Sequence, residues 1–141
     1  MKTAYKIFEN LPKEAISIRT SVFIKEQGFK NEFDDIDAKA HHLIFYADDI
    51  PVGCARFFTE DNQSENYILG RLAVLKSHRK LNLGTKIMVA VQETIKKLGG
   101  KKISLSAQCQ AKNFYEKLGF VASGEIYLDE TCPHIHMEKL L

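Results

Sequence analysis

The basic turn at residues 79–84, RKLNLG, has the residue types and spacing of a phosphate-binding loop. An apolar run typical of a buried strand precedes it, and a segment with apolar residues every three to four positions follows, the period of a helix with one buried face. These helical positions are Leu83, Ile87, Met88, Val91, Ile95 and Leu98. A basic turn at a helix start offers backbone N–H groups and the positive end of the helix dipole to an anion. The turn therefore predicts a site for phosphate.

The spacing of this turn differs from two common nucleotide-binding loops. No Gly-Lys-Ser/Thr follows, as a Walker A loop requires, and the dinucleotide pattern GxGxxG is absent. Taken alone, the turn is equally compatible with an ordinary strand–turn–helix connection whose basic side chains are solvated.

A second motif lies at residues 107–120, AQCQAKNFYEKLGF. The two stretches resemble the paired signatures of the GNAT acyltransferases, Arg/Gln-x-x-Gly-x-Gly/Ala and an Asn-x-x-Ala that leads into Tyr-Glu-Lys-x-Gly-Phe. Asn82 replaces the first loop glycine and Gln108 replaces the Asn; Asn tolerates a left-handed backbone and caps helices, so the loop remains compatible. Because both motifs occur in the family's order and at about its spacing, the chain is identified as a member of this superfamily.

Shorter fragments resemble one bacterial branch of the superfamily, the YjcF-like or ElaA-like proteins. These fragments are VFIKEQ at 22–27, VLKSHR at 74–79, AQCQ at 107–110 and PHIHM at 133–137. The substrates of that branch are poorly defined, so this resemblance leaves the acceptor open.

The resemblance implies an α+β sandwich, the GNAT fold, with a mixed and mostly antiparallel sheet of about six to seven strands and helices on both faces. The hydrophobic pattern agrees and predicts a single domain over residues 1–141, with strands near 3–8, 42–46, 52–58, 68–74, 103–107, 120–128 and 135–140. Helices are expected near 10–28, 83–98 and 108–118. In the first, Ile16, Ile18, Val22 and Phe23 are expected to face inward. The polar stretch EDNQSE at 60–65 is predicted to be a turn.

Composition limits the class of protein. The chain has 141 residues, 45% of them hydrophobic and 27% charged, which suits one globular domain. A net charge of +2 is too small to indicate nucleic acid or a membrane surface as partner. Three cysteines without a CxxC pair predict neither a disulfide framework nor a metal site. With no apolar leader and no apolar run of about 18 residues, a soluble cytoplasmic protein is expected.

The resemblance implies acetyl-CoA as co-substrate and assigns residues to it. Backbone N–H groups of the central strand would bind pantetheine and polarise the thioester carbonyl, at Leu72, Ala73 and Val74. The loop would hold the pyrophosphate through Arg79, Lys80, Leu81, Asn82, Leu83, Gly84 and Thr85, with Gly84 permitting close backbone approach. Further cofactor contacts would come from Gln108 and Asn113. Tyr115 would be the general acid that protonates the departing thiolate.

The general base is not fixed by the motifs. Gly70 stands where many family members have a Glu, so another group must take the amine's proton. The branch resemblance offers Glu26, His42 and His134, each of which could equally be a hydrogen-bonded scaffold residue. An imidazole has the intrinsic pKa best suited to this transfer. A thiol nucleophile is disfavoured, because direct transfer needs none.

The acceptor and the function remain open between alternatives. The acidic segment, residues 31–39, contains Glu32, Asp34, Asp35 and Asp37. It is either a solvated loop or short helix, or a wall that attracts a cationic amine. One hypothesis is an N-acetyltransferase acting on a small amine or a protein amino group, for which a homodimer is possible. The other is a catalytically silent module that binds acetyl-CoA as a sensor, which the absence of Glu at Gly70 makes conceivable.

Overall fold

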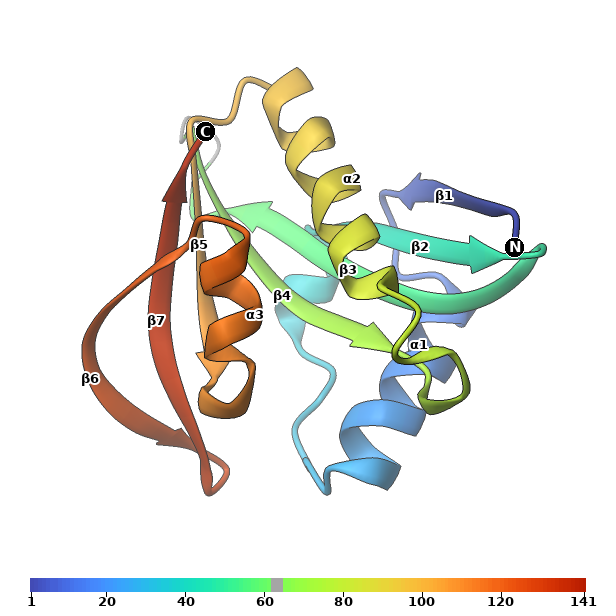
Figure 1. Cartoon of the computed structure of the whole chain (residues 1–141), viewed down its shortest axis with the longest axis horizontal. Coiled ribbons are helices and arrows are strands. Elements are labelled where there is room, and N and C mark those ends of the chain that lie inside the picture. Colours follow the sequence, from blue (N-terminus) through green and yellow to red (C-terminus); the bar gives the residue numbers. More distant parts are fainter. Residues whose placement is uncertain (62–64) are drawn as a thin grey trace.

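The computed structural model of the chain describes residues 1–61 and 65–141 and contains a seven-stranded sheet in the order β1-β2-β3-β4-β5-β7-β6 (Figure 1). Neighbouring strands are antiparallel except β4 and β5, which are parallel. The strands are β1 Thr3–Phe8, β2 His41–Ala47, β3 Ile50–Thr59, β4 Asn66–Val74, β5 Lys102–Gln108, β6 Val121–Asp129 and β7 Cys132–Leu140. The expected α+β architecture with a mostly antiparallel sheet is confirmed.

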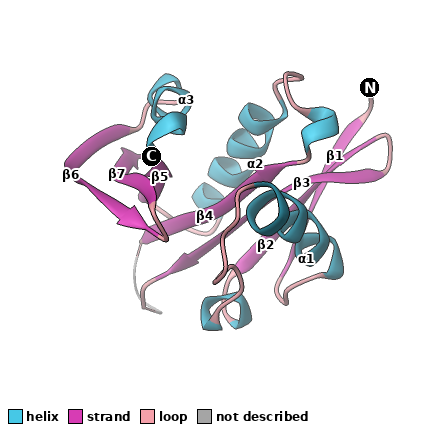
Figure 2. Cartoon of the chain, turned by 90° about the horizontal axis from the view of Figure 1, so that it is seen from below, coloured by secondary structure: helices cyan, strands magenta, loops and turns pink. Residues whose placement is uncertain are grey.

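Helices cover both faces of the sheet (Figure 2). Helix α1, Lys13–Arg19, continues into a π-helical segment, Thr20–Glu26, and lies on one face. Helices α2, Leu83–Lys97, and α3, Lys112–Lys117, lie on the other. Short 3-10 turns are present at Asp35–Ala38, Lys76–His78 and Cys109–Ala111. No helix in the described part of the chain has the length and apolar character needed to span a membrane.

Helix α2 buries the predicted apolar stripe against the sheet, except at its end. The buried members are Leu83, Ile87, Met88, Val91 and Ile95. The assignment of Leu98 to this stripe is wrong, because the helix ends at Lys97 and Leu98 is an exposed C-cap residue. The chain then turns through Gly99, whose φ of 91° is in the left-handed region that glycine adopts most readily.

The first helix differs from the expected apolar pattern at one position. Ile18, Val22 and Phe23 are buried, but Ile16 is exposed. Residues 16 and 18 are about 200° apart around an α-helix, so they cannot both face the sheet. The inward side of α1 is instead completed by Arg19, a charged residue that is only 1% exposed.

Two connections in the C-terminal half are tighter than predicted. The helix expected over 108–118 begins as a 3-10 turn, and α3 itself has six residues. The last hairpin turns through Glu130 and Thr131, both with positive φ, which is the backbone of a two-residue hairpin turn. Residues 62–64 of the polar turn predicted at 60–65 lie outside the described residues.

Candidate active site

The sheet opens between its two parallel strands. The β4–β5 ladder runs only from Asn66 to Leu69 on β4, although β4 continues to Val74. On its other side β4 has a bulge, where two residues, Arg71 and Leu72, face the single Ala55 of β3. Arg71 has a φ of 56°, a left-handed conformation that is uncommon for a residue with a side chain. The backbone of β4 beyond Leu69 is therefore unpaired towards β5.

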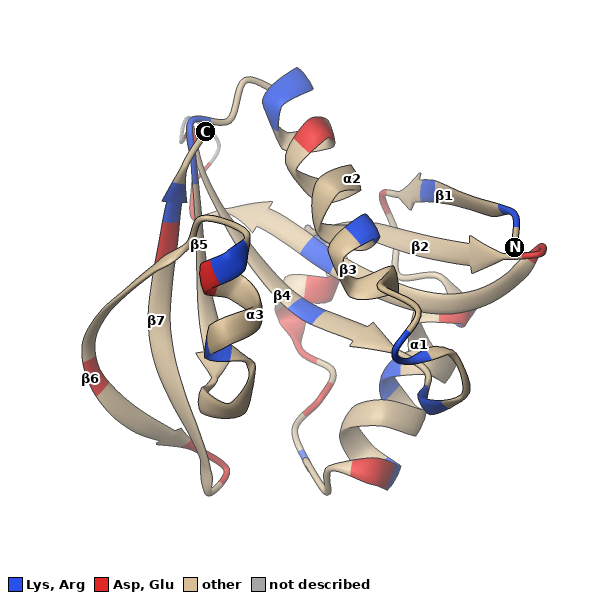
Figure 3. Ribbon diagram, viewed as in Figure 1, with Lys and Arg blue, Asp and Glu red and all other residues tan. Residues whose placement is uncertain are grey.

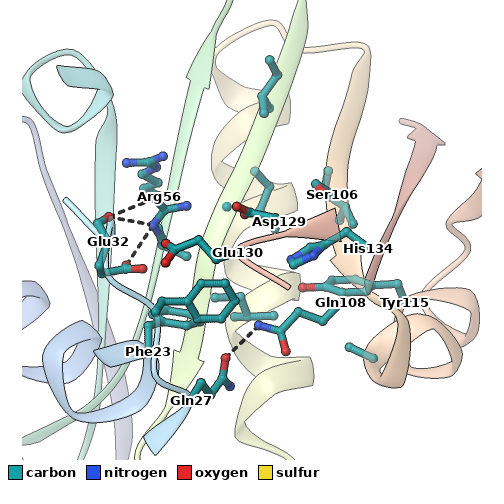
Figure 4. A pocket seen from close by; sticks show the side chains of 18 of the residues that line it. Phe23, Gln27, Glu32, Arg56, Ser106, Gln108, Tyr115, Asp129, Glu130 and His134 are labelled. Atoms are coloured by element: carbon teal, nitrogen blue, oxygen red, sulfur yellow. Dashed lines mark hydrogen bonds and ion pairs between the residues drawn. The ribbon is translucent and has the colours of Figure 1, made fainter. Parts of the chain in front are cut away.

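A cavity of about 840 Å³ lies at this opening. Its wall combines residues from the π-helical segment after α1 and the chain that follows it, the two diverging strands, α3 and the β6–β7 turn (Figure 4). Of the residues assigned from the sequence, the cavity is lined by Leu72, Arg79, Gln108, Tyr115 and His134. Ala73 is buried on the opposite side against α1, and Asn113 is exposed on α3 outside the lining.

The basic turn ends at the N-terminus of α2, where no side chain makes a capping hydrogen bond. Asn82 is the N-cap of α2 in a left-handed conformation, and its side chain makes no capping hydrogen bond. No acidic residue occupies the first turn, so the first N–H groups of the helix remain available to an anion. Lys80 is also left-handed, which curls the turn. These residues fit the pyrophosphate of acetyl-CoA.

Gly84 has a packing reason as well as the expected one. A Cβ placed there would lie 3.3 Å from the ring of Phe114 on α3. A larger side chain would therefore displace the ring of Phe114.

The side chain of Arg79 is held by two partners, Glu26 and Val74. Its guanidinium forms a two-point ion pair with Glu26, in which Nη2 donates over 2.7 Å, and its Nε donates to the carbonyl oxygen of Val74 over 3.0 Å. The hydrogen bond from Arg79 lowers the pKa of Glu26, so this carboxylate stays ionised. Glu26 therefore lies beside the first residue of the basic turn and not in the wall of the cavity.

Tyr115 combines burial with an accessible hydroxyl. The residue is 8% exposed and contacts Phe114 and Phe120 edge-on, with ring centroids 5.0 and 5.8 Å away. Its hydroxyl makes no hydrogen bond within residues 1–61 and 65–141 and is directed into the cavity beside His134 (Figure 4). Burial raises the pKa of Tyr115, so the phenol keeps its proton.

His134 directs one ring nitrogen into the cavity. The residue is 6% exposed, and its Nδ1 lies 2.8 Å from the carbonyl oxygen of Cys132. A carbonyl can only accept, so this contact assigns the proton of the neutral ring to Nδ1 and the free lone pair to Nε2. The ring stacks on Tyr127 at 6.1 Å and meets the edge of Phe29 at 6.4 Å. These contacts hold Nε2 in the orientation of a proton acceptor.

His42 is placed differently from His134. It is 1% exposed, its Nε2 contacts the carbonyl oxygen of Asp37 over 2.9 Å, and it does not line the cavity.

Gln108 lines the cavity, but its amide already donates to Gln27 over 2.8 Å. A contact from Gln108 to pantetheine would therefore replace or extend the bond to Gln27.

The acidic segment forms the short 3-10 helix Asp35–Ala38, and two of its carboxylates are buried, Glu32 at 4% and Asp37 at 5% exposed. Asp37 accepts hydrogen bonds from Arg19 over 2.8 and 3.1 Å and from Arg56 over 2.9 Å. Burial raises the pKa of Asp37, but the bonds from Arg19 and Arg56 outweigh burial and lower it to about 2. Asp37 is therefore ionised at neutral pH.

Two further carboxylates of this segment, Glu32 and Asp34, are also paired, whereas Asp35 is exposed. Glu32 lies 2.8 Å from Nε of Arg19 and 2.8 Å from Nε of Arg71. Asp34 lies 2.7 Å from Nη1 of Arg56. In Figure 3 the red bands of this segment lie beside blue bands on β3 and β4. Three arginines from α1, β3 and β4 thus neutralise three carboxylates, so this segment presents little net charge to an amine.

The β6–β7 turn contributes cavity residues that the sequence motifs did not indicate. Asp129 and Glu130 both line the cavity. The Glu130 carboxylate accepts the backbone N–H groups of Lys30 and Asn31 over 2.8 and 2.9 Å, which ties this turn to the segment after α1. Both acids were interpreted only as turn residues; the alternation of side chains along the hairpin was the available signal, because it places Asp129 on the same face as His134.

The profile of the acetyltransferase (GNAT) domain matches residues 9–141 of the chain. The chain belongs to the GNAT acetyltransferase family. The match includes the helix start, the diverging strands and the C-terminal hairpin, so every wall of the cavity described above lies in the GNAT domain.

Individual GNAT proteins are similar along nearly the whole chain. The N-acetyltransferase YjcF of Bacillus subtilis (strain 168) is 35% identical over 142 residues, which cover 99% of both chains. The crystal structure of Escherichia coli ElaA has a TM-score of 0.87 at 26% identity and covers 98% of this chain and 99% of its own. N-acetylglutamate synthase from Neisseria gonorrhoeae, solved with coenzyme A and N-acetylglutamate, shares the fold with a TM-score of 0.74 at 15% identity, over all of this chain and 36% of its own. The expected resemblance to the YjcF and ElaA branch is thereby confirmed.

Proposed function

We propose that the protein is an acetyl-CoA-dependent N-acetyltransferase in which an amine attacks the thioester directly. The observation that carries this proposal is the placement of Tyr115 and His134 side by side at the opening between β4 and β5, each with one polar atom free towards the cavity. Acid and base are the two groups that direct acetyl transfer needs. A protein that only binds acetyl-CoA needs neither.

Acetyl-CoA would lie with its pyrophosphate at the start of α2 and its pantetheine along the unpaired edge of β4. The GNAT neighbour solved with coenzyme A supports a fold of this kind holding that molecule. Backbone N–H groups near Leu72, at the bulge, would meet the thioester oxygen, and such a donor is commonly worth about 3 kcal/mol in the transition state. Acetyl-CoA supplies the activated acetyl group for the reaction.

The two side chains would move the protons. The nitrogen lone pair of the amine forms the C–N bond, and the C–S bond breaks with its electron pair on sulfur. The Nε2 atom of His134 accepts the proton that the amine loses, and the Tyr115 hydroxyl donates its proton to the sulfur. Because burial raises the pKa of Tyr115, the donor is fully protonated before the reaction begins. The products are an N-acetylamine and coenzyme A with a free thiol.

The test is acetyl transfer to a panel of primary amines, followed by release of the free thiol and by the mass of the acetylated product. Tyr115→Phe is the matched control, because it removes one hydroxyl from a buried ring. Amine-dependent thiol release that requires the Tyr115 hydroxyl is expected. Tight binding of acetyl-CoA without transfer to any amine would instead support the catalytically silent sensor, the alternative raised by Gly70 at the usual Glu position.

A further inference from the structure

The cavity wall contains four carboxylates, and three of them already have partners. Glu32 and Asp34 are paired with arginines, and both oxygens of Glu130 accept backbone N–H groups. Asp129 lines the same cavity and has no hydrogen-bond or ion-pair partner in the part of the chain that the structure describes. It is therefore the lining carboxylate that is free to bind a cation.

The hairpin register places Asp129 close to the free nitrogen of His134. Tyr127 pairs with His134 and Asp129 pairs with Cys132 across β6 and β7. Side chains two residues apart on a strand share a face, so Asp129 is the diagonal neighbour of His134, typically about 7–8 Å away. Figure 4 shows the two side chains reaching into the same space. An amino group placed between them would contact a carboxylate on one side and Nε2, in the nine-tenths buried His134, on the other.

We propose that Asp129 is the counter-ion that holds the acceptor's ammonium group in front of His134, and that the acceptor is a cationic primary amine without a carboxylate beside its amino group. This inference rests on the proposed acetyl transfer. Opposite charge attracts the protonated amine from solution, and His134 takes one ammonium proton before attack. The second proton, lost once the C–N bond has formed, replaces the one that Tyr115 gives to the sulfur. A carboxylate next to the amino group would lie against Asp129 and be repelled. Phe23 and Phe29 line the same cavity and suit an apolar substituent.

Several other titratable or charged groups surround this position. Cys132 is opposite Asp129 on β7, and burial together with the Asp129 charge raises the pKa of its thiol. Glu130 follows in the turn, Tyr115 faces the cavity from α3, and Arg71 faces it from β4. Burial raises the pKa of Tyr115, so its hydroxyl stays neutral. Above neutral pH the pH dependence of amine binding is therefore expected to follow the charge of the amine itself.

The experiment compares the wild type with Asp129→Asn and uses Glu125→Gln as the matched control, because Glu125 lies on the same strand and is exposed outside the cavity. The probes are benzylamine and phenylglycine, which differ by one carboxylate. Calorimetric binding to the protein saturated with CoA is measured beside acetyl transfer. Asp129→Asn should raise both Kd and KM for benzylamine about ten-fold at pH 7.5, with kcat changed less than about three-fold. Glu125→Gln should match the wild type.

Two further measurements distinguish recognition of the amine's charge from a structural effect of the Asp129→Asn substitution. The ratio of kcat/KM between wild type and Asp129→Asn should approach one as the pH rises through the pKa of the amine, about 9–10 for such amines. The wild type should bind phenylglycine with a Kd about ten-fold higher than that for benzylamine. In Asp129→Asn the ratio of these two Kd values should be smaller.

The outcomes separate this inference from the proposed function. Equal benzylamine Kd in wild type and Asp129→Asn, stronger binding of phenylglycine, or no benzylamine binding to the wild type would each overturn the role of Asp129. Acetylation of benzylamine with equal KM in both proteins would retain the transferase and reject the counter-ion. Binding that depends on Asp129 without any acetylation would retain the amine site and reject the transferase.

Discussion

Replacing Asp37 by Asn should destabilise the protein strongly at neutral pH. The carboxylate is 5% exposed and accepts from Arg19, Arg56 and the backbone N–H of Asp34. The amide would leave two buried guanidinium groups without their shared counter-ion, a loss of about 3–5 kcal/mol for buried pairs. For a domain of this size such a loss lowers Tm by about 10 °C or more.

The pH dependence of this loss follows from the pKa of Asp37. The pKa is lowered in the folded protein from 3.8 to about 2, and a shift of this size corresponds to about 2 kcal/mol. A lowered pKa stabilises the folded state above the unfolded value, and this contribution is lost as the pH falls from near 4 to about 2. Between pH 7 and pH 3 the stability difference between wild type and Asp37→Asn should therefore narrow by about 1 kcal/mol.

Urea unfolding from pH 7 to pH 3 measures both quantities. Asp35→Asn is the matched control, because Asp35 is on the same 3-10 turn and exposed, so its substitution should cost less than about 0.5 kcal/mol. A free energy of unfolding for Asp37→Asn within about 1 kcal/mol of the wild type at pH 7 would refute the reasoning. So would a difference that stays constant down to pH 3.

Three other predictions concern catalysis and cofactor binding. Tyr115→Phe should lower kcat about ten- to a thousand-fold while calorimetry finds the same Kd for acetyl-CoA, and an unchanged kcat would assign the ring to packing alone. His134→Gln should lower kcat/KM about a hundred-fold or more, whereas an unchanged kcat/KM would point to a different base. Arg79→Ala should raise the Kd for acetyl-CoA about three- to ten-fold. Glu26→Gln should lower this Kd, because the guanidinium of Arg79 is then released towards the pyrophosphate. A higher Kd in Glu26→Gln would show that Glu26 instead holds Arg79 in its binding position.

The family resemblance predicted the fold, and local patterns predicted most of its helices and strands. The 3.6-residue period of α2 and the apolar runs of β2, β3 and β4 follow from which face each element buries, and the structure places them there. The errors occur where a boundary or a helical register depends on neighbouring elements. Ile16 and Leu98 are apolar residues that a sequence window assigns to the core, but the chain geometry turns both to solvent.

The charge environment of the site could not be predicted in the same way. A sequence shows that residues 31–39 are acidic, but the three arginines that neutralise them come from α1, β3 and β4, far apart along the chain. Tyr115 and His134 were indicated by motif and branch resemblance, whereas Asp129 gains its significance only from the register of β6 against β7. Ion pairs and strand pairing between residues far apart in the sequence therefore determine the charge of the site, which the motifs left open.

The short parallel ladder between β4 and β5 also has a consequence for the order of folding. Strands β1 to β4 join their neighbours as successive antiparallel pairs, and β6 joins β7 across a two-residue turn. By contrast, the pairing of residues 66–69 with 102–105 joins segments that are separated in the chain by the whole of α2. The β1–β2 pairing also closes a long segment, the one that contains α1, so both pairings cost more loop entropy than the hairpins and are expected to form later. The β4–β5 junction forms the root of the cavity, so the cavity can be complete only after one of these late closures.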